Sequence, residues 1–210
     1  MLLPRRDRRE LIVRQQAGLP SAVKAAAREI VECVRNGGED ALREYALRFD
    51  ERLPSESLYL TKEEILAALE TLNDADRERL ERIAGRIESF AKVQREALQP
   101  VSIDVPGGRA GHYIAAVERA GCYAPGGRYP LPSSVLMTAI TARVAGVSTV
   151  WVASPRPAQI TTAAAAIAGA DGLLAVGGAH AIAALAYGVG PVPPSDIVVG
   201  PGNEYVTAAK

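Results

Sequence analysis

The stretch Leu173-Leu174-Ala175-Val176-Gly177-Gly178-Ala179-His180-Ala181-Ile182 decides the fold. Four apolar residues predict a short strand, two glycines predict a turn, and the small apolar residues that follow predict a helix over residues 179–187. The same order recurs on both sides, with strands predicted at 147–152 and 197–199 and helices at 158–168 and from Asn203. Alternating units of this kind specify an α/β fold with a largely parallel sheet and helices packed over it.

The chain before about residue 115 has charged helical patterns instead. The expected helices run from a Ser21 cap to about Arg35, from Glu39 to about Phe49 after a stop at Gly37-Gly38, from a capping box at Thr61, and from Asn73 or Asp74 to about Leu98. Their charged faces are most simply solvated surface. This region is therefore predicted to be helical and to precede the α/β part.

A hairpin is predicted between these helices and the α/β part. Residues 101–105 alternate at period two, Pro106-Gly107-Gly108 is typical of a turn, and residues 113–117 are expected to form the returning strand. Residues 1–18 have arginine-rich ends and are predicted to be an arm able to reach a partner subunit. The chain thus divides into an arm, a helical region with a hairpin, and an α/β region.

Composition excludes several classes of function. The 210 residues include 24 basic and 24 acidic ones, so no field of one sign is available to hold nucleic acid or an anionic membrane. No window approaches the roughly 20 apolar residues of a membrane span, and the first residues do not resemble an export signal. A cytoplasmic protein with reduced Cys33 and Cys122 is expected. Since no paired histidine is evident near Cys122, we expect a small buried hydrophobe there, not a nucleophile.

Three glycine-containing turns precede helices in the predicted α/β part: residues 123–127, 177–178 and 200–203. The carboxyl ends of parallel strands meet at one edge of a sheet, so these turns should converge. Free N–H groups at helix N-termini favour an anion such as a pyrophosphate. Glycine also serves turn geometry alone, and Ser133, Ser134 and Asn203 are ordinary helix caps. With no G-x-G-x-x-G fingerprint present, spacing alone leaves both interpretations open.

Longer blocks of sequence help to decide between an anion site and simple turn geometry. The stretch Gly121-Cys122-Tyr123-Ala124-Pro125-Gly126-Gly127-Arg128-Tyr129-Pro130-Leu131-Pro132-Ser133-Ser134-Val135-Leu136-Met137 closely resembles the signature loop and helix of histidinol dehydrogenases. Residues 176–188, 199–210, 37–45 and 49–50 also resemble that family, in the same order along the chain. The resemblance identifies the chain as the N-terminal half of such an enzyme.

The resemblance implies an NAD-dependent, zinc-dependent oxidation of L-histidinol through an aldehyde to L-histidine, the last step of histidine biosynthesis. It implies an aldehyde-dehydrogenase-like fold of two α/β/α units and an intertwined homodimer. In that scheme residues 123–210 are the dinucleotide-binding domain, incomplete at its C-terminal end. Residues 19–122 are the first part of the substrate and zinc domain, and residues 1–18 are the arm.

The family's dinucleotide contacts correspond to three residues. Tyr123 would pack against and hydrogen-bond the cofactor, and Asn203 would offer an amide at the start of a helix. The alternatives are a half-buried tyrosine at a strand end and simple helix capping. Many family members have glutamine where this chain has His180, and an imidazole replaces only part of a carboxamide's hydrogen bonds. A metal role for His180 is improbable because the only other histidine is His112, in the hairpin.

The family's zinc ligands, acid–base pair and substrate segment correspond to positions beyond Lys210. We therefore expect this chain alone not to oxidise histidinol, to need a complementary C-terminal half, and to lack the last strand of its sheet. Two alternatives stay open. One is a related dehydrogenase acting on another small alcohol. The other is a non-catalytic nucleotide-binding remnant.

Overall fold

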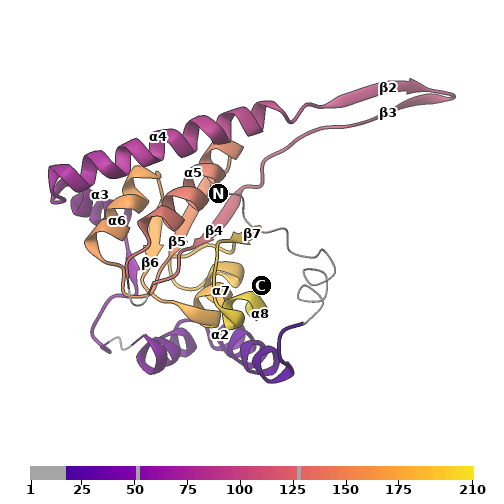
Figure 1. The fold of residues 1–210 in the computed structure, drawn as a ribbon. Coiled ribbons are helices and arrows are strands. Elements are labelled where there is room, and N and C mark those ends of the chain that lie inside the picture. The colour runs from indigo at the N-terminus through magenta and orange to yellow at the C-terminus, as the bar shows by residue number, and fades with distance from the viewer. Residues whose placement is uncertain (1–17, 51–52, 127–128) are drawn as a thin grey trace, which may run out of the picture.

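A computed structural model describes residues 18–50, 53–126 and 129–210 (Figure 1). The helices are α2 (Ser21–Phe49), α3 (Lys62–Glu70), α4 (Asp74–Glu96), α5 (Pro132–Ala145), α6 (Gln159–Ile167), α7 (Gly178–Tyr187) and α8 (Glu204–Ala209). The strands are β1 (Tyr59–Leu60), β2 (Val101–Val105), β3 (Gly108–His112), β4 (Arg119–Tyr123), β5 (Thr149–Ala153), β6 (Gly172–Leu174) and β7 (Ile197–Val199). The predicted arm falls outside the described residues except for Gly18.

The central sheet has five strands in the order β1-β6-β5-β4-β7. The pairs β6-β5, β5-β4 and β4-β7 are parallel, and only the edge strand β1 is antiparallel. The predicted α/β fold with a largely parallel sheet is therefore confirmed. The other sheet edge is β7, whose first residue, Ile197, is exposed.

Helices cover both faces of the sheet (Figure 1). Along β5, Val150 and Val152 pack into a core with α5 and α6, which α3 and α4 also enter. The alternate residues Trp151 and Ala153 pack into a second core with α2 and α7. Successive side chains of a strand point to opposite faces, so a strand covered on both sides must be apolar throughout. This requirement explains the uninterrupted apolar runs in the sequence.

Most of the helix ends and caps predicted for the helical region are confirmed. The predicted helix stop is confirmed as a kink at Gly38, which has φ of 58° and ψ of −132°, inside the long helix α2. The Thr61 capping box and the Asn73 cap are both present. The predicted Ser21 cap is wrong: Pro20 precedes the helix, no side chain caps it, and Ser21 is already helical. Pro20 takes the N-cap position with a non-helical ψ of 140°, so the helix begins at Ser21 and not after it.

The hairpin has a different register from the predicted one. Strand β3 is Gly108–His112, with Val101 opposite His112 and Val105 opposite Gly108, and residues 113–117 form no strand. The prediction of residues 113–117 as the returning strand is wrong because the turn at Pro106-Gly107, with Gly107 at φ of 88°, is only two residues long. Every hairpin residue is exposed, and the hairpin projects from the body beyond α4 (Figure 1).

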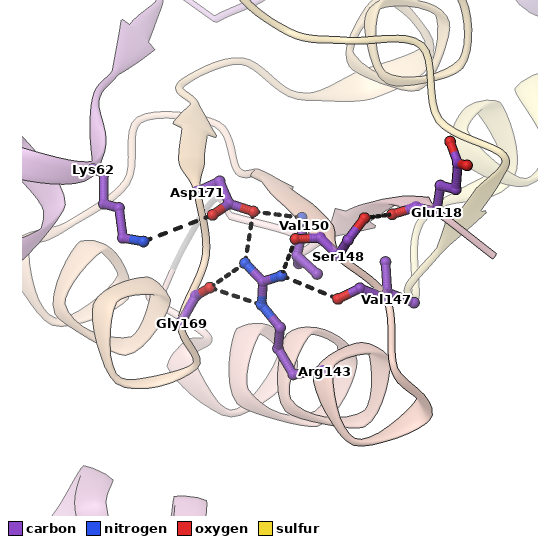
Figure 2. Close-up of polar contacts among 8 residues, drawn as sticks. All are labelled: Lys62, Glu118, Arg143, Val147, Ser148, Val150, Gly169 and Asp171. Carbon is purple, nitrogen blue, oxygen red and sulfur yellow. Dashed lines mark hydrogen bonds and ion pairs between the residues drawn. The ribbon is translucent and has the colours of Figure 1, made fainter. Parts of the chain in front are cut away.

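Arg143 and Asp171 fasten the amino end of the parallel sheet (Figure 2). The Arg143 guanidinium donates to the carbonyl oxygens of Gly169, Val147 and Ser148 and pairs with Asp171 at 2.6 Å. Asp171 also accepts the N–H of Val150 at 2.9 Å. One arginine in the last turn of α5 therefore ties that helix to the starts of β5 and β6.

Candidate functional site

A cavity of about 520 Å³ opens at the carboxyl ends of the parallel strands. The loops after β4, β5, β6 and β7 contribute to its wall together with α2, α7 and α8. It is lined by Ala26, Ile30, Phe49, Asp50, Tyr123, Gly126, Pro155, Gly177, Gly178, Ala179, His180, Asn203 and Tyr205. The three residues singled out from the sequence, Tyr123, His180 and Asn203, thus line one cavity although 80 residues separate the first from the last.

Tyr123 is the last residue of β4, and its side chain faces α7 and not α5. Its hydroxyl accepts the N–H of Gly178 at 3.2 Å, and the residue is only 4% exposed. Burial raises the pKa of Tyr123 above its ordinary value of 10.0, with a smaller lowering by the Gly178 N–H. The hydroxyl is therefore neutral at physiological pH and joins the start of α7 to the end of β4.

Asn203 is the N-cap of α8, where its side-chain oxygen accepts the N–H of Val206 at 3.0 Å. The capping role anticipated from the sequence is therefore real. Asn203 also lines the cavity, so capping does not remove it from the candidate site. The turn before it needs glycine: Gly200 has φ of 127°, and a Cβ there would overlap the carbonyl oxygen of Tyr123.

His180 lies deep in the cavity wall and is 1% exposed. Its Nε2 lies 2.8 Å from Oδ2 of Asp50, the residue that follows α2. The ring packs near Tyr45 and Phe49, with both centroids 6.0 Å away. The imidazole is thus held by a carboxylate and by two aromatic rings from the helical region.

The Gly177-Gly178 turn departs from the expected anion site. The N–H of Gly177 donates to the Asp50 carboxylate at 3.0 Å, and that of Gly178 donates to Tyr123. The prediction of free N–H groups is therefore wrong for these two residues, because a carboxylate of the chain itself already lies at the N-terminus of α7. The sequence reasoning missed Asp50 as a lining residue, although the block Phe49-Asp50 carries part of the family resemblance.

Cys122 lies beside Tyr123 on the opposite face of β4 and is fully buried. Burial raises the pKa of its thiol to about 11. The prediction of a buried hydrophobe is confirmed.

In the ranges 18–50, 53–126 and 129–210 no group of three or more His, Cys, Asp or Glu residues could hold a metal ion. Within those same ranges, no helix has the length and apolar character needed to cross a membrane.

The chain is similar to known proteins along most of its length. The profile of the protein family described as histidinol dehydrogenase matches residues 13–210. The chain belongs to the histidinol dehydrogenase family. The histidinol dehydrogenase of Caulobacter vibrioides is 45% identical over 202 residues, which cover 93% of this chain and 46% of the relative. That of Methanococcus maripaludis is 44% identical over 196 residues, which cover 90% of this chain and 46% of the relative.

A solved structure supports the same family. The crystal structure of histidinol dehydrogenase from Elizabethkingia anophelis superimposes with a TM-score of 0.81 at 28% sequence identity, covering 92% of this chain and 46% of that one. The chain therefore spans about half the length of the histidinol dehydrogenases it matches, and it corresponds to their N-terminal half.

Proposed function

We propose that this chain binds NAD as part of a histidinol dehydrogenase that oxidises L-histidinol through the aldehyde to L-histidine. The observation that carries the proposal is the position of the cavity. Strands β5 and β6 follow β4 on one side, whereas β7 pairs with its other side. In doubly wound α/β sheets such a reversal of strand order opens a crevice at the carboxyl ends, and dinucleotides bind there.

The residues at this crevice suit a dinucleotide. Tyr123 and Asn203 end or follow the two strands that flank the reversal, and His180 lies on the helix between them in sequence. The volume of about 520 Å³ falls in the usual range for small-molecule sites. A smaller cavity of about 90 Å³ shares Gly126 and Pro155 with the first.

The chain's own residues would bind and orient the cofactor. NAD supplies the acceptor for the hydride that leaves the alcohol carbon. Tyr123 offers a neutral hydroxyl and an aromatic face, and Asn203 offers an amide that its capping bond leaves partly free. The resemblance also implies zinc, but the described residues supply no ligand cluster, so we derive no step through a metal. Activation of the alcohol is assigned to a complementary C-terminal half.

The proposal extends to the assembly. We assign residues 123–210 to the dinucleotide-binding unit of an aldehyde-dehydrogenase-like fold and residues 19–122 to the first part of the second unit. A homodimer and a complementary half are the proposed partners, in the cytoplasm. Val101, Ile103 and Val105 lie on one face of the projecting hairpin and are all exposed, which supports a further chain or segment packing there.

Isothermal titration with NAD tests the proposal. We expect saturable binding by the chain, loss of most of that binding in Tyr123→Ala, and histidinol oxidation only when a polypeptide corresponding to the C-terminal half of the family is supplied. Binding of NAD without oxidation in that mixture would favour a nucleotide-binding remnant. Oxidation of other small alcohols in preference to histidinol would favour a related dehydrogenase. Absence of NAD binding by the wild-type chain would refute the proposal.

A further inference from the structure

We propose that Asp50 is the positioning residue of the dinucleotide cavity, because its carboxylate joins the Gly177-Gly178 turn to the His180 ring and sets the direction in which both face the cofactor. This inference rests on the proposed function. It assigns a role to the end of α2, which lies 127 residues before the glycine turn in the sequence.

One oxygen atom carries both interactions. Oδ2 of Asp50 accepts the N–H of Gly177 at 3.0 Å and lies 2.8 Å from Nε2 of His180. The Asp50 side chain is 8% exposed and the His180 side chain 2% exposed. A buried carboxylate is tolerated only when it is paired and hydrogen-bonded, so these two partners are what allows Asp50 to stay there. The same bonds fix the partners.

The carboxylate also decides which ring nitrogen carries the proton. When the imidazole is neutral, an acceptor beside Nε2 holds the proton on that nitrogen and leaves Nδ1 as an acceptor. The ring has little freedom to turn, because His180 is almost fully buried and its ring lies beside those of Tyr45 and Phe49. Asp50 therefore determines what His180 can offer to a ligand.

Asp50 acts on the backbone of the site as well. Gly178 has φ of 66°, and its N–H donates to the hydroxyl of Tyr123. Fixing the N–H of Gly177 on Asp50 fixes the neighbouring peptide, and through it the hydroxyl of Tyr123. Two of the three proposed cofactor contacts, His180 and Tyr123, are thus oriented from one carboxylate that is itself placed by α2.

The test replaces Asp50 by asparagine, which keeps the size and one acceptor oxygen but removes the charge. We expect Asp50→Asn to weaken NAD binding about tenfold, because a charge-assisted hydrogen bond is lost. Asp171→Asn is the matched control: that carboxylate also accepts a backbone N–H and pairs with a basic side chain, but it lies at the other end of the sheet. We expect Asp171→Asn to lower stability and to leave the dissociation constant for NAD unchanged.

A spectroscopic readout separates positioning from a merely structural role. The chain has two histidines, so nitrogen-15 spectra of the imidazoles show His180 beside His112, and His112→Asn assigns the signals. We expect the proton on Nε2 of His180 in the wild type and a mixture of tautomers in Asp50→Asn. This comparison needs no NAD. If the tautomer is unchanged and NAD binds equally well in Asp50→Asn, the inference is overturned.

A second pair of variants covers the case in which Asp50→Asn does not fold. His180→Gln keeps an N–H for Asp50, whereas His180→Phe keeps a ring among Tyr45 and Phe49 without any donor. We expect His180→Gln to bind NAD about tenfold more tightly than His180→Phe. Equal dissociation constants would overturn the inference. Failure of the wild type to bind NAD would instead refute the proposed function, whatever the tautomer of His180.

Discussion

Each end of the parallel sheet is organised by a carboxylate that accepts a backbone N–H and pairs with a basic side chain. At the amino end Asp171 takes the N–H of Val150 and the guanidinium of Arg143 (Figure 2). At the carboxyl end Asp50 takes the N–H of Gly177 and lies against His180. The side chain of Asp171 is 31% exposed, whereas that of Asp50 is 8% exposed.

The partners explain why the two ends differ. A guanidinium has five donors in a rigid fork. Arg143 donates to carbonyl oxygens from several segments and so holds these segments together. An imidazole has two nitrogens, and His180 uses one on Asp50 within a cavity wall. A paired carboxylate therefore holds segments together at the amino end of the sheet and helps to form the wall of the cavity at the carboxyl end.

The largest expected effect is that of Gly200→Ala at the carboxyl end. The new Cβ would overlap the carbonyl oxygen of Tyr123, and the φ of 127° is unfavourable for alanine. We expect a loss of about 3 kcal/mol or more in urea unfolding. Gly108→Ala in the hairpin is the control, because a Cβ there meets nothing within 4 Å and its φ is not left-handed. Equal stability of the two variants would contradict the close approach of β7 to β4.

Arg143→Ala tests the amino end. Its carbonyl partners lose charged donors, and the partly exposed Asp171 loses its main ion pair, so we expect a loss of about 2 kcal/mol in the same unfolding experiment. The dissociation constant for NAD should stay within twofold of wild type. Arg143→Lys keeps the charge without the fork and should be intermediate in stability. A tenfold loss of NAD affinity in Arg143→Ala would erase the distinction between the two ends.

Tyr123→Phe and Tyr59→Phe form a matched pair of hydroxyl deletions. The Tyr123 hydroxyl accepts the N–H of Gly178, whereas that of Tyr59 is buried and has no partner among the described residues. We expect Tyr123→Phe to lose about 1 kcal/mol in thermal unfolding and Tyr59→Phe to lose nothing or to gain slightly. Only Tyr123→Phe should weaken NAD binding, by about fivefold. Equal losses of stability would show that the Gly178 bond contributes nothing.

The smallest expected effect is a loss of folding stability at alkaline pH. Burial, followed by the charge of Glu39, raises the pKa of Tyr59 from 10.0 to about 12. The folded state therefore keeps its proton while the unfolded state loses it, so stability is retained below pH 10 and falls as the pH rises toward 12. Wild type should lose more stability than Tyr59→Phe between pH 10 and 12 in urea titrations. Parallel losses in wild type and Tyr59→Phe would contradict the raised pKa.

Local patterns in the sequence predicted most of the fold. The runs at Val150, Leu173 and Val198 are short and apolar and are bounded by glycine or proline, so strands, turns and covering helices follow from period and length. The hairpin register was not predictable in this way, because Gly108–His112 has no alternation of apolar and polar residues comparable to that of β2. Cap preference predicts Ser21 as the N-cap of α2, whereas Pro20 occupies that position and Ser21 is already helical.

The candidate site was predicted only in part. Tyr123, His180 and Asn203 follow from strand ends and from the family resemblance, and they do line one cavity. Asp50 could not be deduced from pattern alone, since nothing local pairs a residue after a charged helix with a glycine turn 127 positions later. The occupied N–H groups of Gly177 and Gly178 were missed for the same reason.

Helix α2 packs against α7 and α8, so binding of the proposed cofactor would be coupled to the docking of α2. Ala26, Ile30 and Asp50 belong to the cavity wall, so a ligand that binds the closed wall must also stabilise the docked helix, by an amount that grows with the logarithm of ligand concentration. Amide protons of α2 should then exchange more slowly as NAD is added. Helix α2 would then report the binding of the proposed nucleotide, although it lies far in sequence from the glycine turns.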